Sequence, residues 1–126
     1  MPSKILIADD EAFIRLLIQQ TLEWFEDLGT LIFTADNGER ALEIIRAEKP
    51  DLVFLDVMMP KVNGFDVCRV VKQDEKLKNI YVVILTAKGQ EFDRLRGEQV
   101  GADKFLTKPF DPDELISLAA AVLQRT

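Results

Sequence analysis

The sequence predicts a doubly wound α/β domain, with five parallel strands in one sheet and helices on both faces. Nearly continuous apolar runs recur along the chain, among them Ile5-Leu6-Ile7 and residues 52–55 and 81–85. Such runs are typical of strands covered on both faces, as in parallel sheets. Apolar residues at helical spacing fill the intervals between them. With 126 residues, the chain suits one core, so we expect residues 1–126 to form a single domain.

The strands are expected at Lys4–Ala8, Gly29–Ala35, Asp51–Asp56, Ile80–Ala87 and Lys104–Thr107. Alternation of these strands with helices favours the sheet order 2-1-3-4-5, which is the flavodoxin-like order. In that architecture ligands bind beyond the carboxyl ends of the strands, where the order reverses between strands 1 and 3. Polar residues at these strand ends are therefore the first candidates for function.

The helices are expected to bury apolar stripes. In the first helix the stripe is formed by Phe13, Leu16, Leu17 and Trp24. The remaining stripes are expected at residues 41–45, at Phe65, Cys68 and Val71, at Phe92 and Leu95, and at Leu115, Leu118, Ala119 and Val122.

The last helix carries a strong start signal. Asp111 can cap it, Pro112 suits its first position, and Glu114 can reach back to the cap.

Composition argues against several classes of protein. Hydrophobic residues make up 48% and charged residues 30% of the chain, an ordinary balance for a globular domain. No apolar run approaches the roughly 20 residues that a bilayer span needs. The stretch before Ile5 is too short for a signal peptide, so we expect a cytoplasmic protein. The net charge of −6 argues against direct binding to nucleic acid, whose phosphates attract Lys and Arg.

The chain contains no histidine and a single cysteine, Cys68. A histidine cannot therefore activate a nucleophile or ligate a metal in this chain, and any phosphohistidine donor must be another molecule. Cys68 lies in an apolar helical stretch, where a small core side chain is its expected role.

Five polar residues stand at strand ends that the predicted topology brings to one edge of the sheet. Asp9 and Asp10 follow the first strand, Asp56 ends the third, Thr86 ends the fourth, and Lys108 follows the fifth. Each has an ordinary alternative role, since Asp often caps a helix or begins a turn, Thr is common in strands, and a lone Lys is usually solvated. Their convergence is more specific than any one of them.

Three carboxylates held close together repel one another, by roughly 4 kcal/mol per pair at about 4 Å and an effective dielectric near 20. The protein can protonate one of them or place a cation among them. Oxygen ligands without His or thiolate favour Mg²⁺ or Mn²⁺, and Mg²⁺ leaves room for phosphoryl oxygens. With Lys108 as a point charge and Thr86 as a hydroxyl donor, the pattern predicts an Asp nucleophile that accepts a phosphoryl group.

Four motifs occur in order along nearly the whole chain: ILIADDE at residues 5–11, DLVFLDVMMP at 51–60, VILTA at 83–87 and GADKFLTKPF at 101–110. Together they resemble the receiver domain of two-component response regulators. The resemblance implies a signalling switch rather than an enzyme. Its partner is a sensor histidine kinase or a histidine phosphotransfer protein, which supplies the phosphoryl group.

The resemblance also implies a role for each acidic residue. Asp56 is the phosphoacceptor. The side chains of Asp10 and Asp56 bind Mg²⁺, Asp9 acts mostly through a coordinated water, and the backbone carbonyl of Met58 is a further ligand.

The basic and switch residues follow in the same way. Lys108 pairs with the phosphoryl group or, without it, with Asp56, and the Lys108–Pro109 peptide bond is cis. On phosphorylation Thr86 bonds a phosphoryl oxygen, and Phe105 turns inward into the vacated space.

The resemblance places the responsive surface on the fourth helix, the last strand and the last helix, from about Gln90 to Gln124. A homodimer, a kinase or an unknown output partner could use this face. Its charged residues are Arg94, Arg96, Lys104, Asp111 and Asp113.

Some positions depart from the commonest family pattern. Phe105 replaces a frequent Tyr, and Val62 and Asn63 replace Met and Asp in the loop before Gly64. Met58 and Lys88 occupy positions that tune phosphoryl lifetime in this family. Because the Met58 side chain is unsuited to holding an attacking water, we expect slow-to-moderate self-dephosphorylation.

Since the chain stops directly after the last predicted helix, we expect no output domain within it, whether it is a standalone regulator or part of a longer protein.

Three other functions are alternatives to the interpretation as a phosphoacceptor switch. An interaction module of the same fold would lack phosphoryl chemistry, but such modules usually lack a key residue. A flavodoxin-like electron carrier would need amides, hydroxyls and glycines after the first strand, where this chain has Asp9-Asp10-Glu11. A phosphatase with an Asp nucleophile typically carries a second Asp two residues later, where this chain has Met58.

Overall fold

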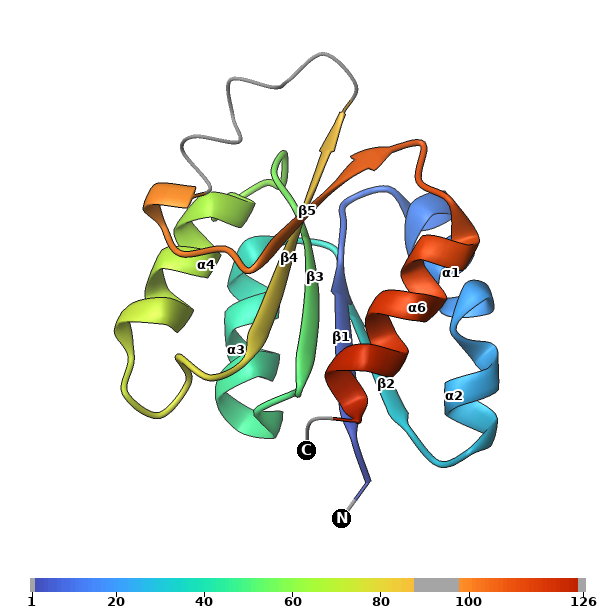
Figure 1. Cartoon of the computed structure of the whole chain (residues 1–126). Helices are drawn as coiled ribbons and strands as arrows, with labels where there is room; N and C mark the ends of the chain where they lie inside the picture. The colour runs from blue at the N-terminus through green and yellow to red at the C-terminus, as the bar shows by residue number, and fades with distance from the viewer. Residues whose placement is uncertain (1, 88–97, 125–126) are drawn as a thin grey trace.

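The computed structural model describes residues 2–87 and 98–124 and confirms the predicted sheet (Figure 1). All four strand pairings are parallel, and the order is β2-β1-β3-β4-β5. The strands are β1 (Lys4–Ala8), β2 (Leu31–Ala35), β3 (Leu52–Asp56), β4 (Tyr81–Ala87) and β5 (Lys104–Lys108). The predicted ranges agree to within two residues. The largest difference is at β2, because Gly29 adopts a φ of 107° in the turn before the strand, a backbone conformation that suits glycine.

Helices cover both faces of the sheet (Figure 1). One face carries α3 (Gly38–Glu48) and α4 (Gly64–Gln73), and the other carries α1 (Ala12–Thr21), α2 (Glu23–Asp27) and α6 (Pro112–Leu123). In residues 2–87 and 98–124, no helix combines the length and apolar character needed to cross a bilayer.

The two faces hold separate apolar clusters. Leu6, Val53 and Ile84 contribute to the cluster under α3 and α4, whereas Ile7 and Phe54 contribute to the cluster under α1, α2 and α6. Residues alternate between the faces along each strand, as the pleat requires. Both faces of β3 are therefore covered, which explains why its sequence is a continuous apolar run.

The stripe predicted for the first helix is wrong. Phe13 is 72% exposed, Leu16 is 54% exposed and Trp24 is 63% exposed, while Leu17 is half-buried. The buried face is formed instead by Ile18, with Leu22 and Phe25 beyond it. The predicted first helix is also divided in two at Leu22, whose φ of −96° and ψ of 11° interrupt it, and α2 begins at the next residue.

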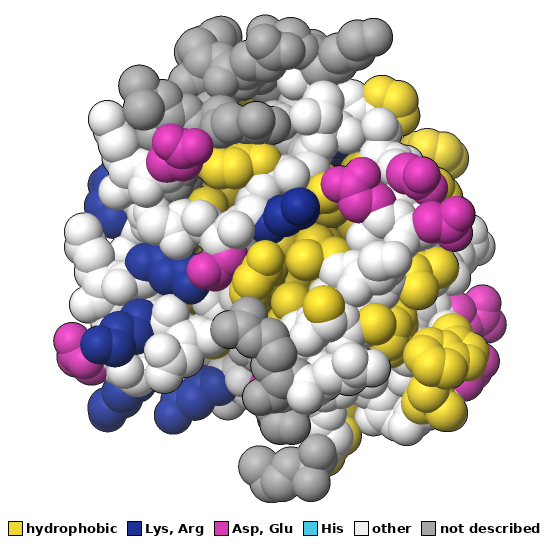
Figure 2. Space-filling view, viewed as in Figure 1, with side chains coloured by type: hydrophobic (Ala, Val, Ile, Leu, Met, Phe, Trp, Pro, Cys, Tyr) yellow, Lys and Arg dark blue, Asp and Glu magenta, His cyan; other side chains and the backbone are white. Residues whose placement is uncertain are grey.

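The other predicted stripes contribute to the core where the structure describes them. Ala41, Cys68 and Leu115 are buried. Figure 2 shows apolar side chains on the surface as well, including a large patch over α2 with acidic side chains around it. The stripe at Phe92 and Leu95 lies outside the described residues.

The start of α6 confirms two parts of its sequence signal. The Asp111 side chain accepts a hydrogen bond of 2.9 Å from the backbone N–H of Asp113, and Pro112 is the first helical residue. Among the described residues, the return bond expected from the Glu114 side chain is not formed, so the cap rests on Asp111.

The exposure difference within α1 gives a direct test. Ile18→Ala should lower the free energy of unfolding by about 2–4 kcal/mol, because it leaves a cavity in a fully buried position. Leu16→Ala, two residues earlier, should change it by less than ~1 kcal/mol, because the side chain already contacts solvent. Urea unfolding followed by circular dichroism measures both, and equal losses in the two variants would contradict the observed orientation of α1.

Candidate functional site

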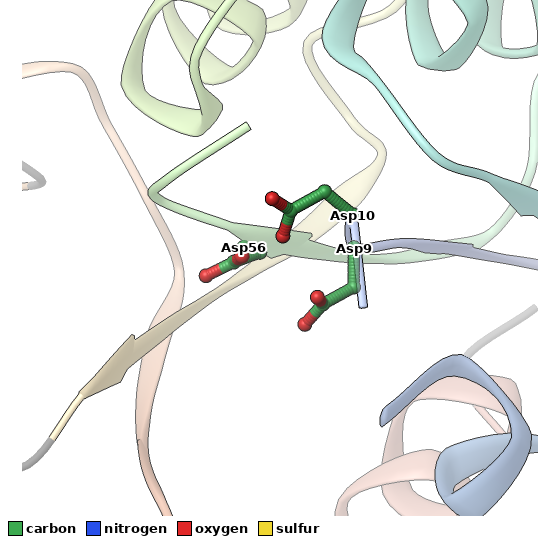
Figure 3. Close-up of side chains that lie close together, drawn as sticks. All are labelled: Asp9, Asp10 and Asp56. Atoms are coloured by element: carbon green, nitrogen blue, oxygen red, sulfur yellow. The ribbon is translucent and has the colours of Figure 1, made fainter. Parts of the chain in front are cut away.

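The carboxylates of Asp9, Asp10 and Asp56 converge at the carboxyl ends of β1 and β3, as the sequence predicts. One oxygen from each lies within 4.8 Å of the others, and Figure 3 shows the three side chains reaching into the same space. Because β1 and β3 are neighbours in the sheet, their ends bring together residues that lie far apart in the chain. Asp9 and Asp56 are buried and Asp10 is exposed.

Asp9 is held in place by several hydrogen bonds. Its Oδ1 accepts a 2.9 Å bond from the backbone N–H of Glu11, and its backbone N–H donates to the Ala35 carbonyl at 3.1 Å. The guanidinium of Arg15 donates to the Asp9 carbonyl at 2.8 Å. Capping was the alternative role for Asp9 or Asp10, but Glu11 occupies the N-cap position of α1. Asp9 therefore stabilises the turn before α1 through Oδ1, while its Oδ2 points into the site.

Lys108 at the end of β5 joins the acidic residues. Its Nζ lies 2.8 Å from Asp9 Oδ2, 3.3 Å from Asp56 Oδ1 and 3.8 Å from Glu11 Oε1. The pairing with Asp56 was expected, but the ammonium lies closer to Asp9. The Lys108–Pro109 peptide bond is cis, as the resemblance implies.

Electrostatics set the two central side chains apart from ordinary surface groups. Burial, together with the negative charge of Asp9, raises the pKa of Asp56 to about 6, although Lys108 and the backbone N–H of Met58 act in the opposite direction. Burial lowers the pKa of Lys108, but its hydrogen bond to Asp9 and the charges of Asp56 and Asp9 outweigh this and leave it raised. Lys108 therefore remains a cation at neutral pH, and Asp56 is a carboxylate whose ionised form the protein disfavours.

The donor set fits a hard divalent cation. The site groups three carboxylates and contains no histidine or thiolate. A divalent cation placed among carboxylates reduces their mutual repulsion, and hard cations prefer oxygen ligands. A cleft of about 290 Å³ adjoins them, lined by Asp10, Glu11, Asp56, Met58, Ala87 and Lys108. An open cleft beside a buried carboxylate leaves room for a phosphoryl group.

Thr86 and Phe105 lie on β4 and β5, the two strands whose ends border the site. Thr86 is buried at the end of β4, one residue before the Ala87 that lines the cleft. Phe105 lies in β5, is half-buried and packs against the cluster under α3 and α4. Both stand on the strands that border the cleft, which agrees with their predicted positions. Lys88, Arg94 and Arg96, also predicted to matter, lie outside the described residues.

Gly64 has a structural role at the site that the sequence did not reveal. A Cβ at this position would lie 2.3 Å from the backbone oxygen of Asp56, far inside contact distance. The N–H of Gly64 donates to the Val57 carbonyl at 3.1 Å. The start of α4 therefore packs directly on the backbone of the candidate phosphoacceptor. The Asn63 side chain caps α4 by accepting a hydrogen bond from the Asp66 N–H.

Comparisons with known proteins agree with this geometry. The family model described as "Response regulator receiver domain" matches residues 5–120. The chain is 43% identical over its whole length to the alkaline phosphatase synthesis transcriptional regulatory protein PhoP of Bacillus subtilis, and covers 50% of that protein. It is 44% identical over 97% of its length to the phosphate regulon transcriptional regulatory protein PhoB of Pseudomonas aeruginosa, and covers 52% of it. The chain thus spans about half the length of these curated relatives.

A solved structure gives the same result for the fold. The receiver domain of the Francisella response regulator 1452 superposes with a TM-score of 0.84 at 31% identity. The match covers 98% of each chain.

The raised pKa of Asp56 predicts how stability depends on pH in the absence of divalent cations. The folded state holds the Asp56 proton more tightly than the unfolded state, so stability falls as pH rises from about 4 to about 6 and then levels off. Asp56→Asn removes this loss of stability, because the asparagine side chain does not ionise. The variant should therefore be more stable than the parent by about 1–3 kcal/mol near pH 7.5, and the difference should vanish near pH 4. Urea unfolding in a chelator measures both pH values.

Asp27→Asn is the matched control, because it removes an exposed carboxylate on α2 and leaves Asp56 in place. An Asp56→Asn variant that is less stable than the parent at neutral pH would contradict the electrostatic picture of the site.

Proposed function

Because the chain belongs to the response regulator receiver domain family, we propose that it is a switch that accepts a phosphoryl group on Asp56. The single observation that carries this proposal is the convergence of Asp9, Asp10, Asp56 and Lys108 at one strand edge beside an open cleft. No other described acidic cluster combines a buried carboxylate with a cation and a cleft. An interaction module without phosphoryl chemistry would not require this costly arrangement.

The chemistry follows from the residues that line the cleft. The Asp56 carboxylate attacks the phosphorus of the donor, and the bond between phosphorus and the donor's nitrogen or oxygen breaks. Lys108 offsets the charge that develops on the phosphoryl oxygens. Asp9, Asp10 and Asp56, with the backbone carbonyl of Met58, would hold Mg²⁺ or Mn²⁺. That ion would neutralise negative charge on the acceptor and the incoming phosphoryl group.

The donor and the response remain part of this proposal. The chain contains no histidine, so a sensor histidine kinase or a histidine phosphotransfer protein would supply the phosphoryl group, in the cytoplasm. Thr86 and Phe105 would pass the change to the surface that includes β5 and α6, where Lys104, Asp111 and Asp113 are exposed. That surface would serve a homodimer or an output partner. Self-dephosphorylation would be slow to moderate.

We propose further that residues 1–126 act as one receiver domain. Its relatives are named as transcriptional regulators and not as enzymes. A receiver of this kind would act on no substrate other than its own phosphoryl group.

Phosphorylation by a small-molecule donor tests the central assignment. Incubation with acetyl phosphate and Mg²⁺ should add the mass of one phosphoryl group to the intact chain, and Asp56→Asn should abolish the addition while the circular dichroism spectrum stays unchanged. Asp27→Asn should be modified as the parent is. A parent protein that gains no phosphoryl group would favour the interaction module instead.

A second variant separates acceptance from signalling. Lys108→Ala should still accept a phosphoryl group, because the nucleophile and the acidic cluster remain, but it should lose most of the structural response at β5 and α6. Amide chemical shifts before and after acetyl phosphate report that response. Lys104→Ala, on the same strand but exposed, serves as the control. Equal responses in the two variants would remove Lys108 from the switch.

A further inference from the structure

The three sulfur-containing side chains in residues 2–87 and 98–124 differ sharply in exposure. Met58 is 66% exposed, Met59 is 7% exposed and Cys68 is fully buried. Burial also raises the pKa of the Cys68 thiol to about 12, so the thiolate, which is the form that attacks peroxides, is scarce at neutral pH. In the described part of the chain, therefore, Met58 is the one sulfur open to a dissolved oxidant.

The position of Met58 makes this exposure consequential. Met58 lines the cleft of about 290 Å³ together with Asp56 and Lys108. Its backbone N–H also bonds the Asp56 carboxylate, which fixes residue 58 against the candidate phosphoacceptor. The neighbouring Met59 packs in the cluster under α3 and α4 instead. Two adjacent methionines thus point to opposite environments, and the exposed one faces the site.

We propose that Met58 is a site of oxidation by hydrogen peroxide, and that its sulfoxide shortens the lifetime of a phosphoryl group on Asp56. In the oxidation, the thioether sulfur attacks one peroxide oxygen and the O–O bond breaks. The sulfur gains an oxygen and loses two electrons, and the other peroxide oxygen leaves as water. A sulfoxide reductase reverses the change. The effect on lifetime rests on the proposed phosphorylation of Asp56.

The shorter lifetime follows from the polarity of the new group. A thioether is a weak hydrogen-bond acceptor, so the unmodified Met58 side chain does not hold a water molecule in a fixed position beside the phosphoryl group. A sulfoxide is polar and carries a strong acceptor oxygen. Placed in the same cleft, that oxygen accepts a hydrogen bond from a water molecule and holds it beside the acyl phosphate. Hydrolysis then requires less ordering of solvent in its transition state.

Peptide mapping tests the oxidation by itself. After mild treatment with hydrogen peroxide, the folded protein should carry one added oxygen at Met58 well before any at Met59 or Cys68. Met59→Leu should oxidise at the same rate as the parent, and Met58→Leu should lack the early product. Oxidation of Met59 or Cys68 at a rate equal to that of Met58 would overturn the assignment, and this readout does not depend on phosphorylation.

Decay of the phosphorylated protein tests the consequence. After removal of acetyl phosphate, the peroxide-treated parent should lose its phosphoryl group at least ~3-fold faster than the untreated parent, well below the roughly 10²-fold that a positioned general base can give. Peroxide should not change the decay rate of Met58→Leu. Met58→Gln, which places a carbonyl acceptor at this position, should decay faster than Met58→Leu without peroxide.

An unchanged or longer lifetime in protein oxidised at Met58 would overturn the second half of the proposal. A parent protein that accepts no phosphoryl group before treatment would overturn the proposed function and the lifetime effect together. The peptide map would still decide the oxidation.

Discussion

Repulsion between buried carboxylates is the constraint on which the rest of the site depends. Asp9 is fully buried and Asp56 is 6% exposed, and burial together with the charge of Asp9 disfavours the ionised form of Asp56. Lys108 lies within 3.3 Å of both, yet the pKa of Asp56 still reaches about 6. The one ammonium therefore does not offset the combined effect of burial and of the Asp9 charge on Asp56. A further cation among the three carboxylates would offset this charge, which is the electrostatic condition for the metal-assisted phosphoryl acceptance that we propose.

The fold supplies the rigidity that keeps these charges together. β1 and β3 are apolar on both faces and lie in the centre of the sheet, so their carboxyl ends cannot separate without opening the core. Gly64 lets the start of α4 approach the Asp56 backbone more closely than any other residue type would allow. Apolar packing far from the cleft therefore contributes free energy that offsets the repulsion between the carboxylates.

Strand positions and strand-end residues could be predicted because buried parallel strands leave a continuous apolar run and the topology fixes where each run ends. The buried face of α1 could not be predicted as easily. On a single continuous helix over residues 12–25, Phe13, Leu16 and Trp24 would share one side. Ile18, Leu22 and Phe25 would share another, so helical spacing alone does not choose between two apolar stripes. The preference of Lys108 for Asp9, and the contact of Gly64 with Asp56, depend on distances between segments that no local pattern encodes.

The position of Lys108 suggests how phosphorylation of Asp56, as proposed, would affect β5. The ammonium divides its hydrogen bonds between Asp9 at 2.8 Å and Asp56 at 3.3 Å. A phosphoryl group would add about −1.5 to −2 charge at Asp56, and its oxygens would compete for the same three donors of Nζ. Because Lys108 ends β5, any shift of its ammonium from Asp9 towards Asp56 acts on the end of that strand, which also carries Phe105. In the proposed switch, a local change of charge would reach the surface through β5, which lies at the edge of the sheet and pairs with β4.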